Sequence, residues 1–324
     1  MTLVLAASSP WLAVMASDRL VTLARGVGGG WIGDHDLLAN KMVVLITTDA
    51  AVILGYSGSA YIGGIPTDNW IADVASPGAN LIATDGSTGM FGFKKPNKLR
   101  FHQVLNRLRG GLSRYPEGAH VSVLVVGWRI RRGLRIPINI KIRSAAALGP
   151  NPDLRLRPTW PMKPRMQSVG AILTLDEFRA PLARRGSVQP WSSNSVINYF
   201  TDIIRNKAQS DRTVGPNVMS AVLRFDPHRG VRRVECCFDP QGAHYQEGYI
   251  EGQQSRQLVS YTPWFLTPGG FHAPTETTGE PGSAACFEVD GCTLITTDVP
   301  RAEPTPSNVG WAVPQPRRPM PGRR

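Results

Sequence analysis

The sequence predicts an α+β fold in which antiparallel strands are covered by helices. Short β-branched and apolar runs, bounded by turn residues, are typical of buried antiparallel strands. Three other segments repeat apolar residues at three- and four-residue steps, which predicts amphipathic helices. The chain has 324 residues, of which 42% are hydrophobic and 19% charged, so it is long enough to bury a large core. Its 33 glycines and 27 prolines indicate many turns.

The chain starts with a predicted strand hairpin. Residues 2–7 and 11–17 are apolar, and the Ser-Ser-Pro sequence at 8–10 favours a turn between them. A secretory signal peptide is the alternative interpretation of this start. Such a signal has Lys or Arg before its apolar core, whereas the first basic residue here is Arg19. We therefore expect a hairpin.

Further strands follow a glycine-rich insertion at 25–40. Each is a short apolar run next to turn residues, the pattern of a buried strand. They are expected at 42–47, 50–54, 120–128, 136–142, 168–175, 218–225 and 231–238. We expect loops at 76–95, which is rich in glycine, and at 151–165, which is rich in proline and arginine.

Helices are expected at 68–74, 96–113 and 194–207. Each has one apolar face and one polar face, as a helix lying on a sheet requires. The apolar faces are formed by Trp70, Ile71 and Val74, by Phe101, Val104, Leu105, Leu108 and Leu112, and by Val196, Ile197, Phe200 and Ile203 or Ile204.

The chain divides into three predicted parts. Residues 1–225 hold the helices and most strands, and 226–299 alternate turn residues with short β-like runs as a β-rich extension. Residues 300–324 contain seven prolines and no apolar period, which predicts a disordered tail.

The positive charge is concentrated in one segment. The chain has a net charge of +12, and residues 91–165 alone contain 17 basic and 2 acidic residues. Such a segment favours an acidic partner, phosphate or nucleic acid. The alternative is a solvated face, since no nucleic-acid-binding motif accompanies the charge.

Several kinds of site and location are disfavoured. No apolar run reaches the roughly 18 residues of a membrane-spanning helix, and we expect a cytoplasmic protein. Asp34-His35-Asp36 has metal-binding residue types, but a solvated loop explains it better. Cys236-Cys237 lie on a predicted strand, where buried thiols are favoured over a site, and Cys286 and Cys292 would pair only in an exported protein. We therefore expect no metal and no cofactor.

Thr2 is the first candidate for chemistry. It directly follows Met1, and methionine removal before a small residue would leave threonine at the amino end. A terminal threonine carries a hydroxyl nucleophile and an amine that can act as its base. The hydroxyl also needs a nearby cation, a carboxylate that holds the cation, and a backbone N–H for the developing oxyanion. Lys41, Asp18 and the glycine loop 55–58 offer these three groups.

The order of these segments resembles the start of proteasome-type β-subunits, which are N-terminal-nucleophile hydrolases. The resemblance rests on Thr2-Leu3-Val4, Ala16-Ser17-Asp18-Arg19-Leu20-Val21-Thr22, Asn40-Lys41-Met42-Val43-Val44 and Gly55-Tyr56-Ser57-Gly58-Ser59-Ala60. It implies a four-layer αββα sandwich. It also implies that Thr2 is the nucleophile, Asp18 the orienting acid, Lys41 the buried cation and Gly55 the oxyanion donor, with Gly58 the second glycine of that loop.

The sequence departs from the family at identifiable places. The interval from Asp18 to Lys41 is lengthened by the glycine-rich insertion, and Ser59 stands where the family has an acid. The serine-rich segment that supports the nucleophile in the family matches only Ser168-Val169-Gly170-Ala171, without its downstream serine.

The resemblance implies a threonine amidohydrolase or peptidase, acting on a peptide or amide substrate without a cofactor. The chain could also form a homo-oligomer. Two alternatives remain. The chain is a catalytically inactive scaffold or binding protein of the same fold, or it binds a polyanion such as nucleic acid through residues 91–165.

Overall fold

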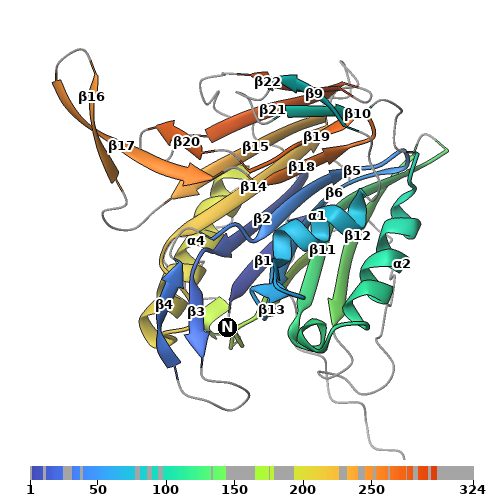
Figure 1. The fold of residues 1–324 in the computed structure, drawn as a ribbon. Coiled ribbons are helices and arrows are strands. Elements are labelled where there is room, and N and C mark those ends of the chain that lie inside the picture. Colours follow the sequence, from blue (N-terminus) through green and yellow to red (C-terminus); the bar gives the residue numbers. More distant parts are fainter. Residues whose placement is uncertain are drawn as a thin grey trace, which may run out of the picture.

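The computed structural model contains two large sheets that pack face to face (Figure 1). It describes residues 2–9, 12–24, 31–36, 39–76, 81–85, 90–93, 98–132, 134–143, 165–174, 176–178, 193–225, 232–239, 245–250, 253–261, 263–274, 276–279, 284–290 and 293–297. Helices and strands both occur, which confirms the predicted α+β class.

The first sheet has seven strands, and every neighbouring pair is antiparallel. Its order is β13 (Arg165–Gly170), β1 (Leu3–Ser8), β2 (Leu12–Asp18), β14 (Val218–Phe225), β15 (Arg232–Asp239), β21 (Ala284–Asp290) and β22 (Thr293–Thr297). The predicted amino-terminal hairpin is therefore confirmed, and it lies inside this sheet, where Val4 pairs with Ser17.

The second sheet has eight strands. Its order is β12 (Leu134–Arg143), β11 (Ser122–Arg131), β6 (Ala50–Ser57), β5 (Met42–Ile46), β18 (Trp264–Thr267), β19 (Gly270–His272), β10 (Met90–Phe93) and β9 (Leu81–Asp85). Only β5 and β18 run parallel among these described pairs. Strands from 226–299 thus extend both sheets.

Helices cover the outer faces of the two sheets. Helices α1 (Thr67–Ala75) and α2 (Phe101–Leu112) bury their apolar faces against the second sheet, and α4 (Ser193–Ser210) does so against the first. All three helices agree with the predicted segments. The 3-10 helix η1 (Pro116–His120) follows α2. None of the helices in the described part of the chain is long and apolar enough to cross a membrane.

Strand alternation divides the buried side chains into separate cores. In β1, Val4 and Ala6 face the space between the sheets, while Leu3 and Leu5 face α4. In β6, Ile53 faces the first sheet and Val52 faces α1 and α2. This alternation is the period-two pattern of a strand buried on both faces. It decides which residues can meet between the sheets.

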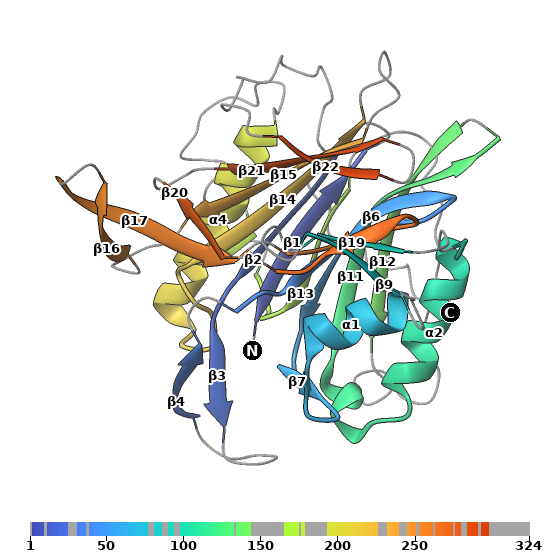
Figure 2. The same ribbon diagram turned by 45° about the horizontal axis from the view of Figure 1, so that its top comes forward.

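Smaller sheets lie at the edges of the molecule (Figure 2). They are β3 (Val21–Ala24) with β4 (Trp31–Asp36), β7 (Tyr61–Ile62) with β8 (Ile65–Pro66), and β16 (Tyr245–Ile250), β17 (Gln253–Tyr261) and β20 (Glu276–Gly279).

Two predicted irregular segments contain strands. The expected loop at 76–95 was wrong, because β9 and β10 form there and join the edge of the second sheet. Part of the insertion at 25–40 forms β4, which pairs with β3. In both cases the strands form because they hydrogen-bond to another segment: β10 pairs with β19, and β4 pairs with β3. The glycine content of a segment does not predict such pairing. The predicted loop at 151–165, apart from Arg165, and the tail at 300–324 lie outside the described residues.

Candidate active site

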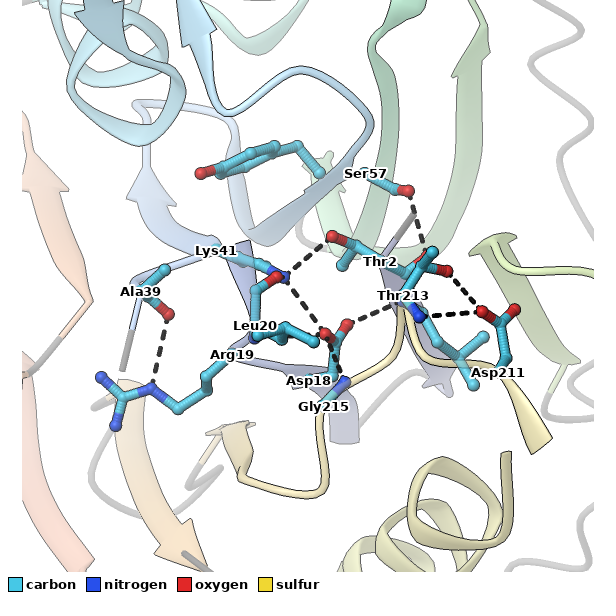
Figure 3. Close-up of polar contacts among 12 residues, drawn as sticks. Thr2, Asp18, Arg19, Leu20, Ala39, Lys41, Ser57, Asp211, Thr213 and Gly215 are labelled. Atoms are coloured by element: carbon cyan, nitrogen blue, oxygen red, sulfur yellow. Dashed lines mark hydrogen bonds and ion pairs between the residues drawn. The ribbon is translucent and has the colours of Figure 1, made fainter. Parts of the chain in front are cut away.

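Thr2, Lys41 and Asp18 lie together at one end of the two sheets (Figure 3). The Lys41 ammonium donates a hydrogen bond of 2.8 Å to Thr2 Oγ1 and one of 3.2 Å to Asp18 Oδ2. All three residues are buried, with Lys41 1% and Asp18 0% exposed. An ammonium at this distance stabilises an alkoxide on the threonine, and the carboxylate balances the charge of the lysine.

The Asp18 carboxylate is held by the backbone on several sides. Leu3 N–H donates to Oδ1 at 2.7 Å, and the N–H groups of Leu20 and Gly215 donate to Oδ2 at 3.2 and 3.1 Å. The donors belong to the start of β1, the link between β2 and β3, and the segment before β14. A buried carboxylate with these partners is fixed in place, so it can orient the ammonium.

Lys41 is positioned by the residues around it. Its ammonium also donates to the Leu20 carbonyl oxygen. The preceding Asn40 accepts the Met42 N–H at 3.2 Å and donates to Asp68 Oδ2 at 3.0 Å. Burial raises the pKa of Asp68, although hydrogen bonds from Asn69 and Asn40 act in the other direction. The entry to β5 is thus tied to the first turn of α1.

The Thr2 backbone is also clamped. Its carbonyl oxygen accepts from Ala171 N–H at 2.9 Å and from Ser57 Oγ at 3.1 Å. Gly170 makes this approach possible, since it has φ +94° and a Cβ there would lie 1.6 Å from the Thr2 oxygen. The segment 168–171 therefore lies beside Thr2, and the Ala171 backbone contacts it.

Gly55 lies within β6, opposite Met42 on one side and Leu124 on the other. A Cβ there would lie 2.5 Å from Met15 Sδ, so Gly55 allows the two sheets to pack closely. Tyr56 N–H donates to the Lys41 carbonyl. Because N–H groups alternate along a strand, the Gly55 N–H points the other way, to β11 and not to Thr2.

Gly58 lies just beyond the end of β6 and is exposed. It follows Ser57, whose hydroxyl reaches Thr2. Its φ of +112° favours glycine, and a Cβ would lie 1.7 Å from the His120 oxygen. The Gly58 backbone therefore lies outside the strand ladder, directly after the residue that contacts Thr2.

The segment 211–217 also lies at this site and was not predicted from the sequence. Besides Gly215, it contains Asp211, which accepts from the Thr213 hydroxyl at 2.5 Å and from its N–H at 3.0 Å, next to Thr2 (Figure 3). Burial acts to raise the pKa of Asp211, but these bonds and the positive charges of the amino terminus and Lys207 lower it on balance. In the sequence this segment is marked only by Asp-Arg-Thr at 211–213 in a polar turn, a pattern too common to indicate a site.

The other candidate residues lie on separate strands. Asp34, His35 and Asp36 lie on β4, where the structure describes the backbone only. Cys236 is buried on β15, beside Cys237. Within the described part of the chain, no group of three His, Cys, Asp or Glu side chains is placed to hold a metal.

No family model matches the sequence, and no curated protein matches it. Solved structures do match. The chain is similar in structure to Anbu. A mutant of Anbu from Hyphomicrobium sp. strain MC1 aligns with a TM-score of 0.41 and 13% identity, covering 69% of this chain and 82% of that one.

Two further Anbu structures match to a similar degree. Anbu, described as an ancestral β-subunit, from Yersinia bercovieri gives a TM-score of 0.40 and 11% identity over 68% of this chain and 81% of that one. A helical assembly of the Anbu complex from Pseudomonas aeruginosa gives 0.39 and 14% over 69% and 81%.

Proposed function

We propose that the protein is an N-terminal threonine hydrolase of amide or peptide bonds, built on the four-layer αββα sandwich of N-terminal-nucleophile hydrolases. The observation that carries the proposal is the buried contact of the Lys41 ammonium with both Thr2 Oγ1 and Asp18 Oδ2. A lysine and an aspartate can form a buried pair for packing alone. Here the lysine of the pair also contacts a threonine hydroxyl near the amino end of the chain, and this hydroxyl is a nucleophile that the ammonium can activate.

In the proposed reaction, removal of Met1 frees the Thr2 amine. The amine takes the hydroxyl proton, directly or through a water, as Oγ1 forms a bond to the substrate carbonyl carbon. The Lys41 ammonium stabilises the charge on Oγ1 at the start of the attack. The same amine then gives the proton to the leaving nitrogen as the C–N bond breaks. Water hydrolyses the resulting ester and restores the hydroxyl.

The oxyanion of the tetrahedral intermediate needs an N–H donor that is not used by a sheet. The resemblance assigns this role to Gly55, and we propose Gly58 for it, because the Gly55 N–H is directed to β11. Gly58 directly follows the residue that contacts the Thr2 carbonyl, and its left-handed backbone turns away from the strand.

Covalent labelling tests this function. A β-lactone probe should acylate the wild-type protein on Thr2, whereas Thr2→Ala should not react. Thr2→Ser keeps a hydroxyl and should react. Thr48→Ala, at an exposed threonine in the turn before β6, should label like wild type. Equal labelling of wild type and Thr2→Ala would disprove the proposal.

A non-catalytic protein of the same fold is the second candidate, and the segment after Ser168 favours it. The downstream serine that supports the nucleophile in the family is absent, since Ile172 and Leu173 follow Ala171. A non-catalytic chain should take up no more β-lactone probe than Thr2→Ala does.

The proposed binding of a polyanion rests on exposed basic side chains. Around α2, Lys98, Arg100, Arg107, Arg109 and Arg114 are exposed. Binding of a single-stranded oligonucleotide that weakens steeply with added salt would support this role, and no binding at low salt would remove it.

A further inference from the structure

A cluster of basic side chains lies at one end of the second sheet. It is formed by Arg129, Arg131 and Arg132 next to the turn between β11 and β12, and by Lys98 and Arg100 just before α2. Four of the five are exposed, and the side chain of Arg129 is 41% exposed. Between residues 98 and 135 the only acidic residue is Glu117, which lies beyond the other end of α2. The cluster therefore presents a local positive charge to an anionic ligand.

Asp49 joins the two parts of the cluster. Its Oδ2 pairs with Arg129 Nη2 at 3.0 Å, and its Oδ1 accepts the Phe101 N–H at 2.7 Å. Its carbonyl oxygen accepts the Ile130 N–H at 2.7 Å. The start of α2 and the end of β11 are therefore held side by side. The Asp49 carboxylate is engaged by Arg129 and by α2, so it does not balance the charge of the other four basic residues.

An exposed leucine lies within this cluster. Leu134, the first residue of β12, is 62% exposed and is the ladder partner of Arg131. Partners across an antiparallel ladder point to the same face of the sheet, with Cβ atoms roughly 5 Å apart. By strand alternation this is the face on which Ile138 and Ile140 pack under the helices. We call the residues Arg129–Arg132 and Leu134 the hairpin tip.

The hairpin tip projects from the molecule and is anchored at its base. Figures 1 and 2 both show the β11–β12 hairpin extending past its neighbours at one end of the sheet. Arg132 has a φ of +50°, as tight hairpin turns require. The Arg135 guanidinium lies over the ring of Phe225, 3.8 Å from its centroid, which ties the start of β12 to β14 of the first sheet. The tip can therefore meet a flat surface as a preformed unit.

We propose that the hairpin tip, together with the two basic residues before α2, binds the surface of a membrane that contains anionic lipids. Basic side chains at such a surface pair with the anionic headgroups, and a leucine among them enters the apolar layer below. A nucleic acid would use the charges, but a lone leucine is no platform for stacking its bases. This inference rests on the polyanion binding proposed above and names the polyanion as a lipid surface.

The proposed membrane contact lies away from Thr2. Strand β11 begins at Ser122, which pairs with Ser57, the residue whose hydroxyl contacts the Thr2 carbonyl. The hairpin tip is at the opposite end of the same strand. Membrane binding would therefore leave the candidate active site uncovered, and the inference does not depend on hydrolysis by Thr2.

Vesicle flotation of the full chain tests the proposal. At low salt the protein should float with phosphatidylcholine vesicles that contain about 30% phosphatidylserine, and not with phosphatidylcholine alone. Arg131→Gln and Arg132→Gln should each weaken this binding about fivefold, and Leu134→Ser about tenfold. The matched controls are Arg212→Gln and Ile172→Ser, at an exposed arginine and an 80% exposed isoleucine elsewhere in the fold, and both should bind like wild type.

A second ligand separates this inference from the proposed polyanion binding. Binding of a single-stranded oligonucleotide at the same low salt should be unchanged by Leu134→Ser, because this leucine acts only on a lipid surface. If the protein binds the oligonucleotide but neither kind of vesicle, polyanion binding is supported and the membrane inference is wrong. If it binds neither ligand, both proposals fail. Equal binding to the two kinds of vesicle, or hairpin-tip variants that bind like Arg212→Gln, would also overturn the inference.

Discussion

Replacing Lys41 with methionine should destabilise the protein strongly. The substitution keeps the apolar stem but removes the ammonium from a fully buried site, leaving the Asp18 carboxylate without its opposite charge. Loss of one partner of a buried ion pair costs about 3–5 kcal/mol. Asp18 keeps hydrogen bonds from three backbone N–H groups, so we expect the lower end of that range, about 3 kcal/mol.

Urea unfolding measures this loss as a change in the free energy of unfolding. The control is Lys207→Met, which breaks an ion pair with Glu177 whose side chains are 15% and 32% exposed. A partly solvated pair of this kind is worth about 1 kcal/mol or less. If Lys41→Met costs no more than Lys207→Met, the buried triad is not formed as described.

Two further predictions concern the contact of Gly170 with the Thr2 carbonyl and the buried carboxyl of Asp68. Gly170→Ala should cost about 3 kcal/mol or more in urea unfolding, because its Cβ would meet the Thr2 carbonyl and its φ is +94°. Gly64→Ala, at φ +79° with no atom within 4 Å of the added Cβ, should cost only about 1 kcal/mol, and equal losses would contradict the clamp. Asp68→Asn should remove a loss of stability that the wild type shows as the pH rises above 3.8, the ordinary pKa of an aspartate. Burial raises the pKa of Asp68 above 3.8, so the folded chain holds this proton longer than the unfolded chain. An unchanged pH dependence of unfolding would contradict this.

The sequence was sufficient to predict the three helices and the amino-terminal hairpin. Helix α2 follows from five apolar residues at helical spacing, all of which are buried. The resemblance in segment order is what drew attention to Thr2, Asp18 and Lys41, and Lys41 hydrogen-bonds both of the others. Their catalytic roles stay a prediction.

Other features depend on contacts that no local pattern contains. Strand β18 joins β5 in parallel from more than 200 residues away in the chain, and Gly215 reaches Asp18 across 197 residues. The choice between Gly55 and Gly58 depends on which N–H belongs to the sheet. The direction of the Gly55 N–H is fixed by the register of β6 with β5 and β11, and Gly58 lies beyond the end of β6; the sequence gives neither.

The most direct test is the mass of the amino-terminal tryptic peptide after reaction with a peptide epoxyketone. Such a probe bonds to both the hydroxyl and the free amine of a terminal threonine. The peptide is predicted to begin at Thr2, to end at Arg19 and to carry one probe on its first residue. A peptide that begins at Met1 and carries no probe would contradict the proposed nucleophile.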